Sequence, residues 1–400
     1  MIPFQLLAQE YETPLYVYDF DAMTKQFETL KEAFRGKKSI LAYAVKANSN
    51  LSVIKHFASL GSGADCVSIG EVRRALMAGV PAYKILFSGV GKRDDELREA
   101  ILSDILYINV ESEAELGRVE MVASQLDKVA RISVRVNPNI DPQTHPYIST
   151  GLHDNKFGVD LDSAKRMYIK AKNSQFLDPV GIHFHIGSQL TQLEPIYEAA
   201  VIVADLVRSL SAISIDLKFF DMGGGLGVQY DNEVTITPYD YAQAILGALK
   251  GLDLTIIGEP GRFLTANAGY FLTKVLYEKK NGSKRFVVVD GGMNDLLRPS
   301  LYKAYHRIEA IGKKGEPSAC DVVGPVCESG DFLAKGYELP LMEHNDLLVV
   351  HSAGAYGFGM GSNYNTRGRS AEVAFEKGEA RLIRDRETFE DLVVLETKYL

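Results

Sequence analysis

The 400-residue chain has few cysteines and no surplus of positive charge. Its three cysteines, Cys66, Cys320 and Cys327, are odd in number and lack paired spacing, which argues against a disulfide framework and for a reducing compartment. The formal net charge is −8, and no basic run suggests nucleic acid as a partner. We therefore expect a cytoplasmic protein that binds no nucleic acid.

Long hydrophobic runs are also missing. The apolar stretch at 199–207 is too short to span a bilayer and contains Asp205. The first residues have no cationic start followed by an apolar core, so we expect no signal peptide and no membrane association. With 46% hydrophobic and 24% charged residues, the composition is that of a soluble globular protein, and the length predicts two domains.

Eight short apolar segments alternate with segments of helical spacing between residues 40 and 262. Near-continuous apolar strands are typical of a parallel sheet that is covered on both faces. We predict an α/β fold, a (β/α)8 TIM-type barrel over residues 29–263, because the alternative doubly wound sheet seldom needs eight units. The eight predicted strands lie in segments 40–48, 63–69, 84–89, 106–112, 131–138, 180–188, 218–225 and 254–262.

After about residue 264 the pattern changes to strands separated by turns, with few helices between them. This pattern predicts an antiparallel β domain of sandwich or barrel-like form. An early strand at 14–19 has no partner in the predicted barrel, and chain termini often lie close together. The second domain is therefore expected to comprise residues 1–28 and 264–400.

Polar or glycine residues follow the predicted barrel strands, where barrels of this kind place their active sites. Core packing alone would not put ionisable groups after so many strands, so we expect an active site there. The residues, in chain order, are Lys46, Asp65, Ser88, Glu111, Arg135, His185, Ser188, Gly223, Gly224, Gly225, Gly227, Glu259 and Arg262.

Lys46 has two interpretations. It could extend its ammonium group into water while its stem is buried, which segment 40–50 alone favours. It could instead be a desolvated amine that acts as a nucleophile towards a carbonyl group.

The glycine-rich segment 223–227 could be a tight turn or a phosphate site formed by backbone amides. Its place after the seventh strand, with Pro260, Gly261 and Arg262 after the eighth, favours phosphate binding.

His183 and His185 would point to the same face of a strand. Cys66 is the only softer ligand nearby, which is too few ligands for zinc, so we expect no metal site. The alternatives are a buried, hydrogen-bonded histidine or an imidazole that stacks on a flat cofactor. A lysine nucleophile, a phosphate site and a carboxylate such as Glu259 together fit pyridoxal 5′-phosphate, whose pyridine nitrogen needs a partner. On this hypothesis Lys46 is the Schiff-base lysine.

The chain resembles the fold-type III pyridoxal-phosphate decarboxylases of basic amino acids over nearly its whole length. The resemblance rests on segments TPLYVYD, YAVKAN, GADCVSIGE, NKFGV, HFHIGSQ, GGGLG, EPGR, RPSLYKAYH, GPVCESGD and GAYG, in this order. It is strongest to the branch that decarboxylates meso-2,6-diaminopimelate to L-lysine and CO2, the last step of lysine biosynthesis.

The resemblance implies a role for each matching residue. Lys46 would carry the cofactor and Cys327 would donate a proton. Further cofactor contacts are implied for Asp65, His185, Ser188, Gly224, Gly225, Gly227, Glu259, Pro260, Gly261, Arg262 and Tyr356. Substrate contacts are implied for Arg262, Arg298, Tyr302, Glu328 and Tyr356. The family also implies a homodimer with shared active sites, in which the Cys327 segment enters the partner's barrel.

Three alternatives stay open. An ornithine- or arginine-type decarboxylase would not need Arg298, because its substrate has no carboxylate at the far end. An enzyme like alanine racemase would share the barrel and cofactor but would need neither Arg298 nor the Cys327 segment. A non-catalytic regulatory homologue would be expected to lack Lys46 or Cys327, and both are present. Without the resemblance, Arg298 reads as a surface residue before Pro299.

Overall fold

The structure is a computed structural model that describes residues 2–141 and 156–400. It divides into two compact units. The barrel unit comprises Thr24–Val228 and Val234–Phe263, and the sheet unit comprises the chain up to Met23, Gln229–Glu233 and Leu264–Leu400. The short segment Gln229–Glu233 was not expected in the sheet unit, because in sequence it lies inside the predicted barrel.

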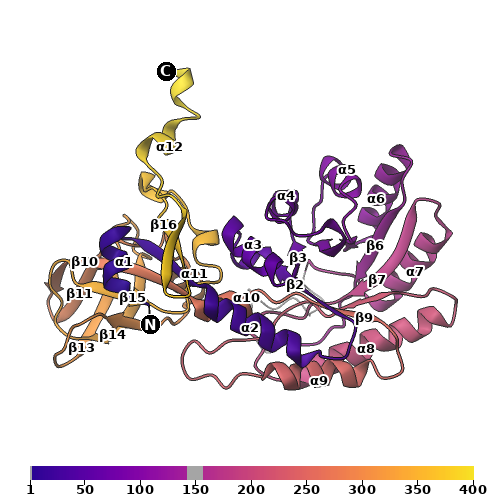
Figure 1. Ribbon diagram of the computed structural model, residues 1–400, viewed down its shortest axis with the longest axis horizontal. Helices are drawn as coiled ribbons and strands as arrows, with labels where there is room; N and C mark the ends of the chain where they lie inside the picture. The colour runs from indigo at the N-terminus through magenta and orange to yellow at the C-terminus, as the bar shows by residue number, and fades with distance from the viewer. Residues whose placement is uncertain (1, 142–155) are drawn as a thin grey trace. The chain divides into compact units, whose positions relative to one another are not determined.

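Eight parallel strands form a closed barrel, which confirms the predicted (β/α)8 fold class (Figure 1). Strand β2 pairs in parallel with both β3 and β9, and this pairing closes the ring. Most of the strand residues are buried, as expected for strands covered on both faces. The strands are β2 (Ser39–Ala44), β3 (Gly63–Cys66), β4 (Ile85–Phe87), β5 (Tyr107–Val110), β6 (Ala130–Arg135), β7 (Leu177–His183), β8 (Phe219–Asp221) and β9 (Thr255–Gly258).

Amphipathic helices surround the barrel (Figure 1). Their starts follow from local capping: Ser68 and Ser112 each accept a hydrogen bond from the backbone amide of a glutamate three residues on. These helices are α3 (Leu51–Ser59), α4 (Ile69–Met77), α5 (Asp94–Leu102), α6 (Glu113–Gln125), α7 (Leu161–Asn173), α8 (Glu194–Ser211) and α9 (Pro238–Ala248), and α2 (Phe20–Ala33) leads into the unit. Short 3-10 turns η1 (Val45–Ala47) and η2 (Ala82–Lys84) follow β2 and precede β4.

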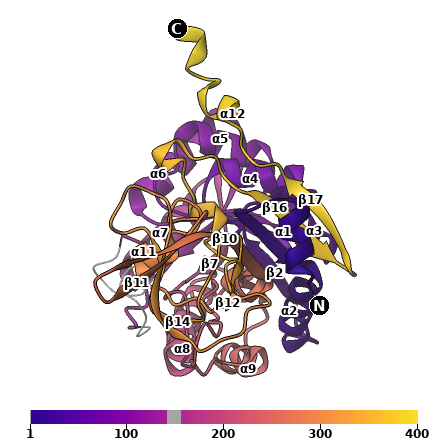
Figure 2. The same ribbon diagram turned by 90° about the vertical axis from the view of Figure 1, so that its left-hand side faces the viewer.

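The sheet unit contains one nine-stranded sheet, and the early strand β1 pairs with β10 and β16 inside it as predicted. Most pairs are antiparallel, but β1 runs parallel to β16 and β11 runs parallel to β13, so the sheet is mixed. Figure 2 shows β11 and β14 on one side and β16 and β17 on the other. The strands are β1 (Leu15–Asp19), β10 (Gly269–Asn281), β11 (Lys284–Val289), β12 (Ile308–Ala310), β13 (Ser318–Val323), β14 (Phe332–Leu339), β15 (Leu347–Val350), β16 (Ala371–Glu376) and β17 (Glu379–Arg384).

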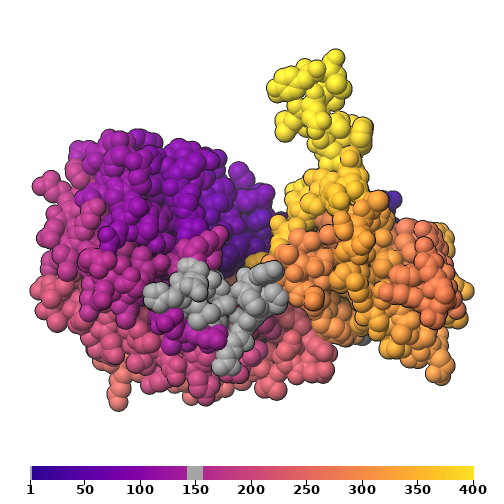
Figure 3. Space-filling view, turned by 180° about the vertical axis from the view of Figure 1, so that it is seen from behind, coloured from indigo at the N-terminus to yellow at the C-terminus, as the bar shows by residue number. Residues whose placement is uncertain are grey.

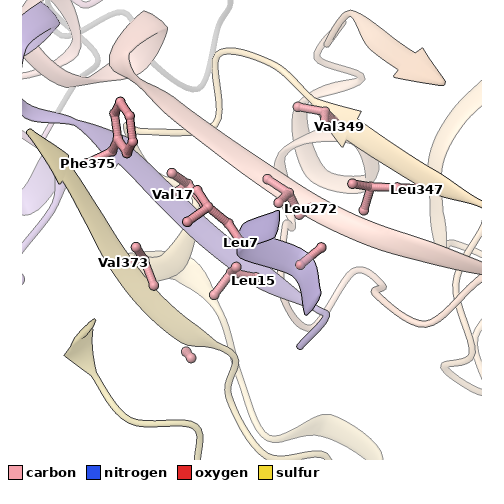
Figure 4. Packing of buried hydrophobic residues seen from close by; sticks show 10 residues of the cluster. Leu7, Leu15, Val17, Leu272, Leu347, Val349, Val373 and Phe375 are labelled. Carbon is pink, nitrogen blue, oxygen red and sulfur yellow. The ribbon is translucent and has the colours of Figure 1, made fainter. Parts of the chain in front are cut away.

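The core of the sheet unit joins segments from both ends of the chain (Figure 4). Leu7 of helix α1 (Phe4–Glu10) packs with Val17 of β1, Leu272 of β10 and Val373 of β16. Burial of such aliphatic side chains stabilises each by roughly 1.5–3 kcal/mol relative to exposure. This burial accounts for the recruitment of the N-terminal strand to a sheet whose other strands lie after residue 264.

Short helices complete the sheet unit. They are α10 (Arg262–Thr265), which begins at the end of the barrel unit, η4 (Ala266–Ala268), α11 (Arg298–Tyr302), η5 (Phe358–Met360), η6 (Tyr364–Thr366), α12 (Phe389–Val393) and η7 (Thr397–Tyr399). The C-terminal segment with α12 and η7, yellow in Figure 3, stands out from the rest of its unit. Among the described residues, no helix has the length and apolar character needed to cross a membrane.

Candidate active site

Lys46 lies in the 3-10 turn that follows β2, and its ammonium group pairs with a carboxylate from the next strand. Its Nζ is 2.8 Å from Oδ2 of Asp65, the third residue of β3. The Asp65 side chain is fully buried, whereas the Lys46 side chain keeps 39% exposure. The Lys46 amine is therefore accessible and held by an ion pair. The desolvated amine that the sequence suggested as one alternative is not observed.

Glu259 follows β9 and belongs to a buried cluster of polar groups. Its Oε2 lies 3.5 Å from Nε2 of His183 at the end of β7. Asp221 at the end of β8 offers a carboxylate oxygen to the same cluster, and the three groups lie within 4.8 Å of one another. Burial raises the pKa of Glu259, but the nearby His183 and Lys46 more than offset it and hold the pKa well below its usual value.

His185 lies two residues beyond the end of β7 and against the start of the glycine-rich segment. Burial lowers the pKa of His185 well below its usual value, and the charges of Arg135 and Lys46 act in the same direction. The ring is therefore neutral at neutral pH, which suits stacking on an aromatic surface. Gly223 has φ of +65°, and a Cβ there would lie 2.8 Å from Nδ1 of His185, so glycine is required at this position.

The glycines after β8 permit close backbone packing. A Cβ on Gly224 would lie 2.3 Å from the carbonyl oxygen of Glu259. A Cβ on Gly225 would lie 2.5 Å from the carbonyl oxygen of Gly187, and a Cβ on Gly227 would lie 2.7 Å from that of Leu190. The glycine segment is thus compressed between the loops after β7 and β9, a constraint that the sequence pattern did not reveal.

Two features in and beside the glycine segment could bind an anion. Within residues 2–141 and 156–400, the amides of Gly224 and Gly225 have no hydrogen-bond acceptor, whereas the amide of Gly227 donates to Leu190. Nearby in the fold, the guanidinium of buried Arg262 donates to the hydroxyl of Ser188 from Nε (3.2 Å) and Nη2 (3.1 Å). Pro260 and Gly261 connect Arg262 to β9, and the carbonyl of Pro260 accepts from the amide of Ala44 in β2.

The polar residues Ser88 and Glu111, which follow β4 and β5, and Arg135, which ends β6, form contacts of their own. Ser88 accepts a hydrogen bond from the side chain of Asn109. Arg135 pairs with Glu111 over 3.3 Å, and both side chains are buried. Because each charge has a partner, this pair is stable inside the protein, and its guanidinium adds positive charge near His185.

In the sheet unit, Arg298 begins α11 and is only 5% exposed, so its interpretation as a surface residue is wrong. Its guanidinium lies 4.9 Å from the ring centroid of Tyr230 and 5.9 Å from that of Tyr302. Its Nε donates to Nε2 of His306 over 3.3 Å, and Nδ1 of His306 donates to the carbonyl of His351. These contacts fix the plane of the guanidinium, which a bidentate carboxylate contact requires.

Cys327 and Glu328 lie on a loop between β13 and β14, and both are exposed. The amide of Cys327 donates to the side chain of Asn365 over 2.7 Å. The loop is anchored by Asp331, which accepts hydrogen bonds from the amides of Met293 and Val326. The thiol of Cys327 is thus exposed, and the loop that carries it is anchored by hydrogen bonds.

Tyr356 has φ of +54°, a strained backbone conformation for a residue with a side chain. The flanking Gly354 and Gly357 could not carry a Cβ, which would collide with the carbonyls of Thr265 and Ala353. Strain of this kind persists where the surrounding structure imposes it, and it is frequent at functional sites.

In the barrel unit, Lys46, Asp65, His185 and Glu259 thus lie at the carboxyl ends of the strands, as predicted. Four supporting residues were not predicted from the sequence. In the barrel unit, Tyr107 donates to Asp221, which lies beside Glu259. In the sheet unit, Tyr230 and His306 contact Arg298. Asp221 could have been noticed as an acid directly after an apolar strand, and His306 ends the quoted segment RPSLYKAYH. Tyr107 and Tyr230 carry no signal that separates them from ordinary aromatic residues.

Comparison with known proteins identifies the family. Residues 20–266 match the family model described as pyridoxal-dependent decarboxylase, pyridoxal binding domain. A diaminopimelate decarboxylase of Campylobacter jejuni is 62% identical over 398 residues, which cover 99% of each chain. The chain belongs to the diaminopimelate decarboxylase family. Members of this family are pyridoxal-dependent enzymes, so the cofactor and the enzyme class predicted from the sequence are confirmed.

Two solved structures of the family agree in fold over nearly the whole chain. Diaminopimelate decarboxylase of Helicobacter pylori, complexed with L-lysine, has a TM-score of 0.97 and 56% identity, and the match covers 99% of this chain and 100% of that one. Diaminopimelate decarboxylase of M. jannaschii, also with L-lysine, has a TM-score of 0.93 and 39% identity, with 98% and 93% covered.

The residues of the barrel unit fit pyridoxal phosphate. Among the described residues, the buried Oε1 atom of Glu259 has no hydrogen-bond partner. This oxygen could accept a hydrogen bond from the pyridinium N–H of the cofactor. The amides of Gly224 and Gly225 offer donors for a phosphate, and Lys46 offers an accessible amine.

The close approach of Gly224 to the end of β9 generates a prediction. In Gly224→Ala the methyl group would overlap the Glu259 carbonyl and displace both loops, so affinity for pyridoxal phosphate should fall about tenfold or more. Gly247→Ala in helix α9 is the matched control, because its methyl group meets only Tyr197 at 3.7 Å. Titration of the cofactor-free variants, followed by absorbance, measures the affinity, and equal affinity of the two variants would contradict the packing argument.

Proposed function

We propose that this protein decarboxylates meso-2,6-diaminopimelate to L-lysine and CO2 with pyridoxal phosphate, the last step of lysine biosynthesis. The observation that carries the proposal is similarity over 99% of the chain to diaminopimelate decarboxylases, including one solved with L-lysine, the product of this reaction. The residues described above are consistent with this chemistry.

When bound, pyridoxal phosphate supplies an electron sink for the electron pair that remains when CO2 leaves the α-carbon. Lys46 would hold the cofactor covalently through its aldehyde, and Asp65 would orient the Lys46 amine. His185 would stack on the ring, and Glu259 would face the pyridine nitrogen and favour its protonated form. The phosphate would be bound by Ser188, Gly224, Gly225, Gly227, Pro260, Gly261 and Arg262. By the family resemblance, Tyr356 would also contact the cofactor.

Substrate recognition follows from the two ends of diaminopimelate. Its far end carries an amine and a carboxylate, whereas ornithine carries only an amine there. Arg298, which His306 orients, would bind the far carboxylate together with Arg262 and the hydroxyl of Tyr302. Glu328 would pair with the far amine, and Tyr356 would border the substrate.

The final proton is assigned to Cys327, whose thiol is exposed within its own chain. We propose a cytoplasmic homodimer in which Cys327 and Glu328 of one subunit complete the site of the other. Exclusion of water around the reacting carbon would then depend on the partner as well as on the barrel.

The activity itself is the first prediction of the proposed function. The purified protein with pyridoxal phosphate should release CO2 from meso-diaminopimelate much faster than from L-ornithine, and it should not racemise L-alanine. Lys46→Ala should retain the fold and lose both the activity and the borohydride-stabilised attachment of the cofactor. Lys38→Ala, an exposed lysine before β2, is the control and should retain both. Peptide mapping that places the reduced cofactor on another lysine would refute the assignment of Lys46.

The second prediction concerns Arg298. An arginine–carboxylate contact in a partly desolvated site is worth roughly 2–3 kcal/mol, so Arg298→Ala should lower kcat/KM for diaminopimelate about thirty- to a hundredfold. Trace activity on ornithine or lysine should change little, because neither has a carboxylate at the far end. Arg307→Ala is the control, since this neighbouring arginine is exposed and pairs with Glu309. Equal losses on all substrates would show that Arg298 supports the fold or the cofactor instead.

The third prediction concerns shared sites. Lys46→Ala and Cys327→Ala subunits are each expected to be inactive, but a mixed dimer would contain one site with both residues intact. Activity should therefore return after subunit exchange, up to about a quarter of the wild-type value for random pairing. Hybrid dimers that form, as shown by differently tagged subunits, and yet stay inactive would place both residues in the site of one chain.

A further inference from the structure

A second carboxyl group lies beside Glu259 with no assigned role. Asp221 ends strand β8 and is fully buried, and Glu259 is only 6% exposed. Oxygen atoms of the two carboxyl groups and a ring nitrogen of His183 lie within 4.8 Å of one another. Oδ2 of Asp221 accepts from the hydroxyl of Tyr107 (2.9 Å), and Oδ1 accepts from the amide of Gly223 (3.0 Å).

Two ionised carboxylates cannot stay this close in a dry interior unless a cation balances them. Burial and the charge of Glu259 raise the pKa of Asp221 well above its usual value, although Gly223 and Tyr107 act in the opposite direction. The charges of His183 and Lys46 instead favour ionised Glu259. The two pKa values are thus shifted in opposite directions, which favours neutral Asp221 beside charged Glu259, as in other carboxyl pairs that share a proton.

We propose that Asp221 is a positioning residue, protonated at neutral pH, whose hydroxyl donates a hydrogen bond to the carboxylate of Glu259. Tyr107 and Gly223 orient Asp221 from β5 and from the glycine segment. Asp221 thereby fixes both the ionisation and the direction of Glu259.

The inference rests on the proposed function for its consequence. A carboxylate that receives a hydrogen bond is a weaker base, so the proton shared with the pyridine nitrogen of the cofactor stays on the nitrogen. Without the Asp221 hydrogen bond, the proton would shift towards Glu259 and the ring would become a weaker electron sink. Asp221 would therefore affect kcat through Glu259 without touching the substrate.

One other state of the cluster is a possible outcome. A divalent cation bound by His183, Asp221 and Glu259 would let both acids ionise. In this state Asp221 would act as an anion, and an amide could not replace it.

The test compares three variants loaded with pyridoxal phosphate that is labelled with 15N in its ring. Asp221→Asn keeps a donor but cannot ionise, so its 15N resonance should stay at the pyridinium position and its kcat should stay within about threefold of wild type. Asp221→Leu has no donor, so its resonance should move towards that of neutral pyridine and kcat should fall about ten- to a hundredfold, with little change in KM. Tyr107→Phe disturbs the same cluster but leaves the Asp221 proton in place, so its resonance should match wild type.

The infrared spectrum of the wild-type protein provides a second measurement, which is independent of the cofactor resonance. It should contain the carbonyl stretch of a protonated carboxylic acid, and Asp221→Asn should remove this band. Absence of this band, one equivalent of bound metal in the purified protein, or an Asp221→Asn resonance at the neutral-pyridine position would each overturn the proposal. Failure to decarboxylate diaminopimelate, with the band and the resonances as expected, would refute the proposed function and leave the role of Asp221 standing.

Discussion

Pairing of β2 with β9 closes the barrel, and the arrangement of the barrel residues depends on this closure. In a closed parallel barrel the carboxyl ends of all strands meet at one rim. Lys46 after β2, Asp65 on β3, His183 on β7, Asp221 on β8 and Glu259 after β9 are distant in sequence, and closure makes them neighbours. The rim thus concentrates ionisable groups, and each needs a partner: Lys46 has Asp65, and Glu259 has His183 and Asp221.

The barrel and the main site positions could be predicted from the sequence because both depend on local signals. A buried parallel strand is a short apolar segment, and an ionisable residue directly after it is conspicuous. Lys46 and Glu259 were found in this way, and the recognition of β1 as a strand without a barrel partner placed it correctly in the sheet unit. The segments of helical spacing between the strands were also correctly predicted as helices, and α7 and α8 are two of them.

Features that depend on pairing between distant segments could not be predicted. The parallel pairing of β11 with β13 has no mark in either segment. The glycines after β8 were interpreted as an anion site. The structure shows that they are also required sterically, because carbonyl groups of the loops after β7 and β9 leave no room for a Cβ atom. The protonation of Asp221 depends on Glu259, which lies 38 residues later and becomes its neighbour only in the fold.

The central claim is that the rim holds pyridoxal phosphate with its ring nitrogen towards Glu259 and its phosphate on the glycine segment. A crystal structure of the protein with pyridoxal phosphate and L-lysine tests it most directly. The account predicts the ring nitrogen within hydrogen-bonding distance of a Glu259 oxygen, and phosphate oxygens that accept from the amides of Gly224 and Gly225. A ring turned the other way, with the phosphate near Glu259 or away from the glycine segment, would contradict it.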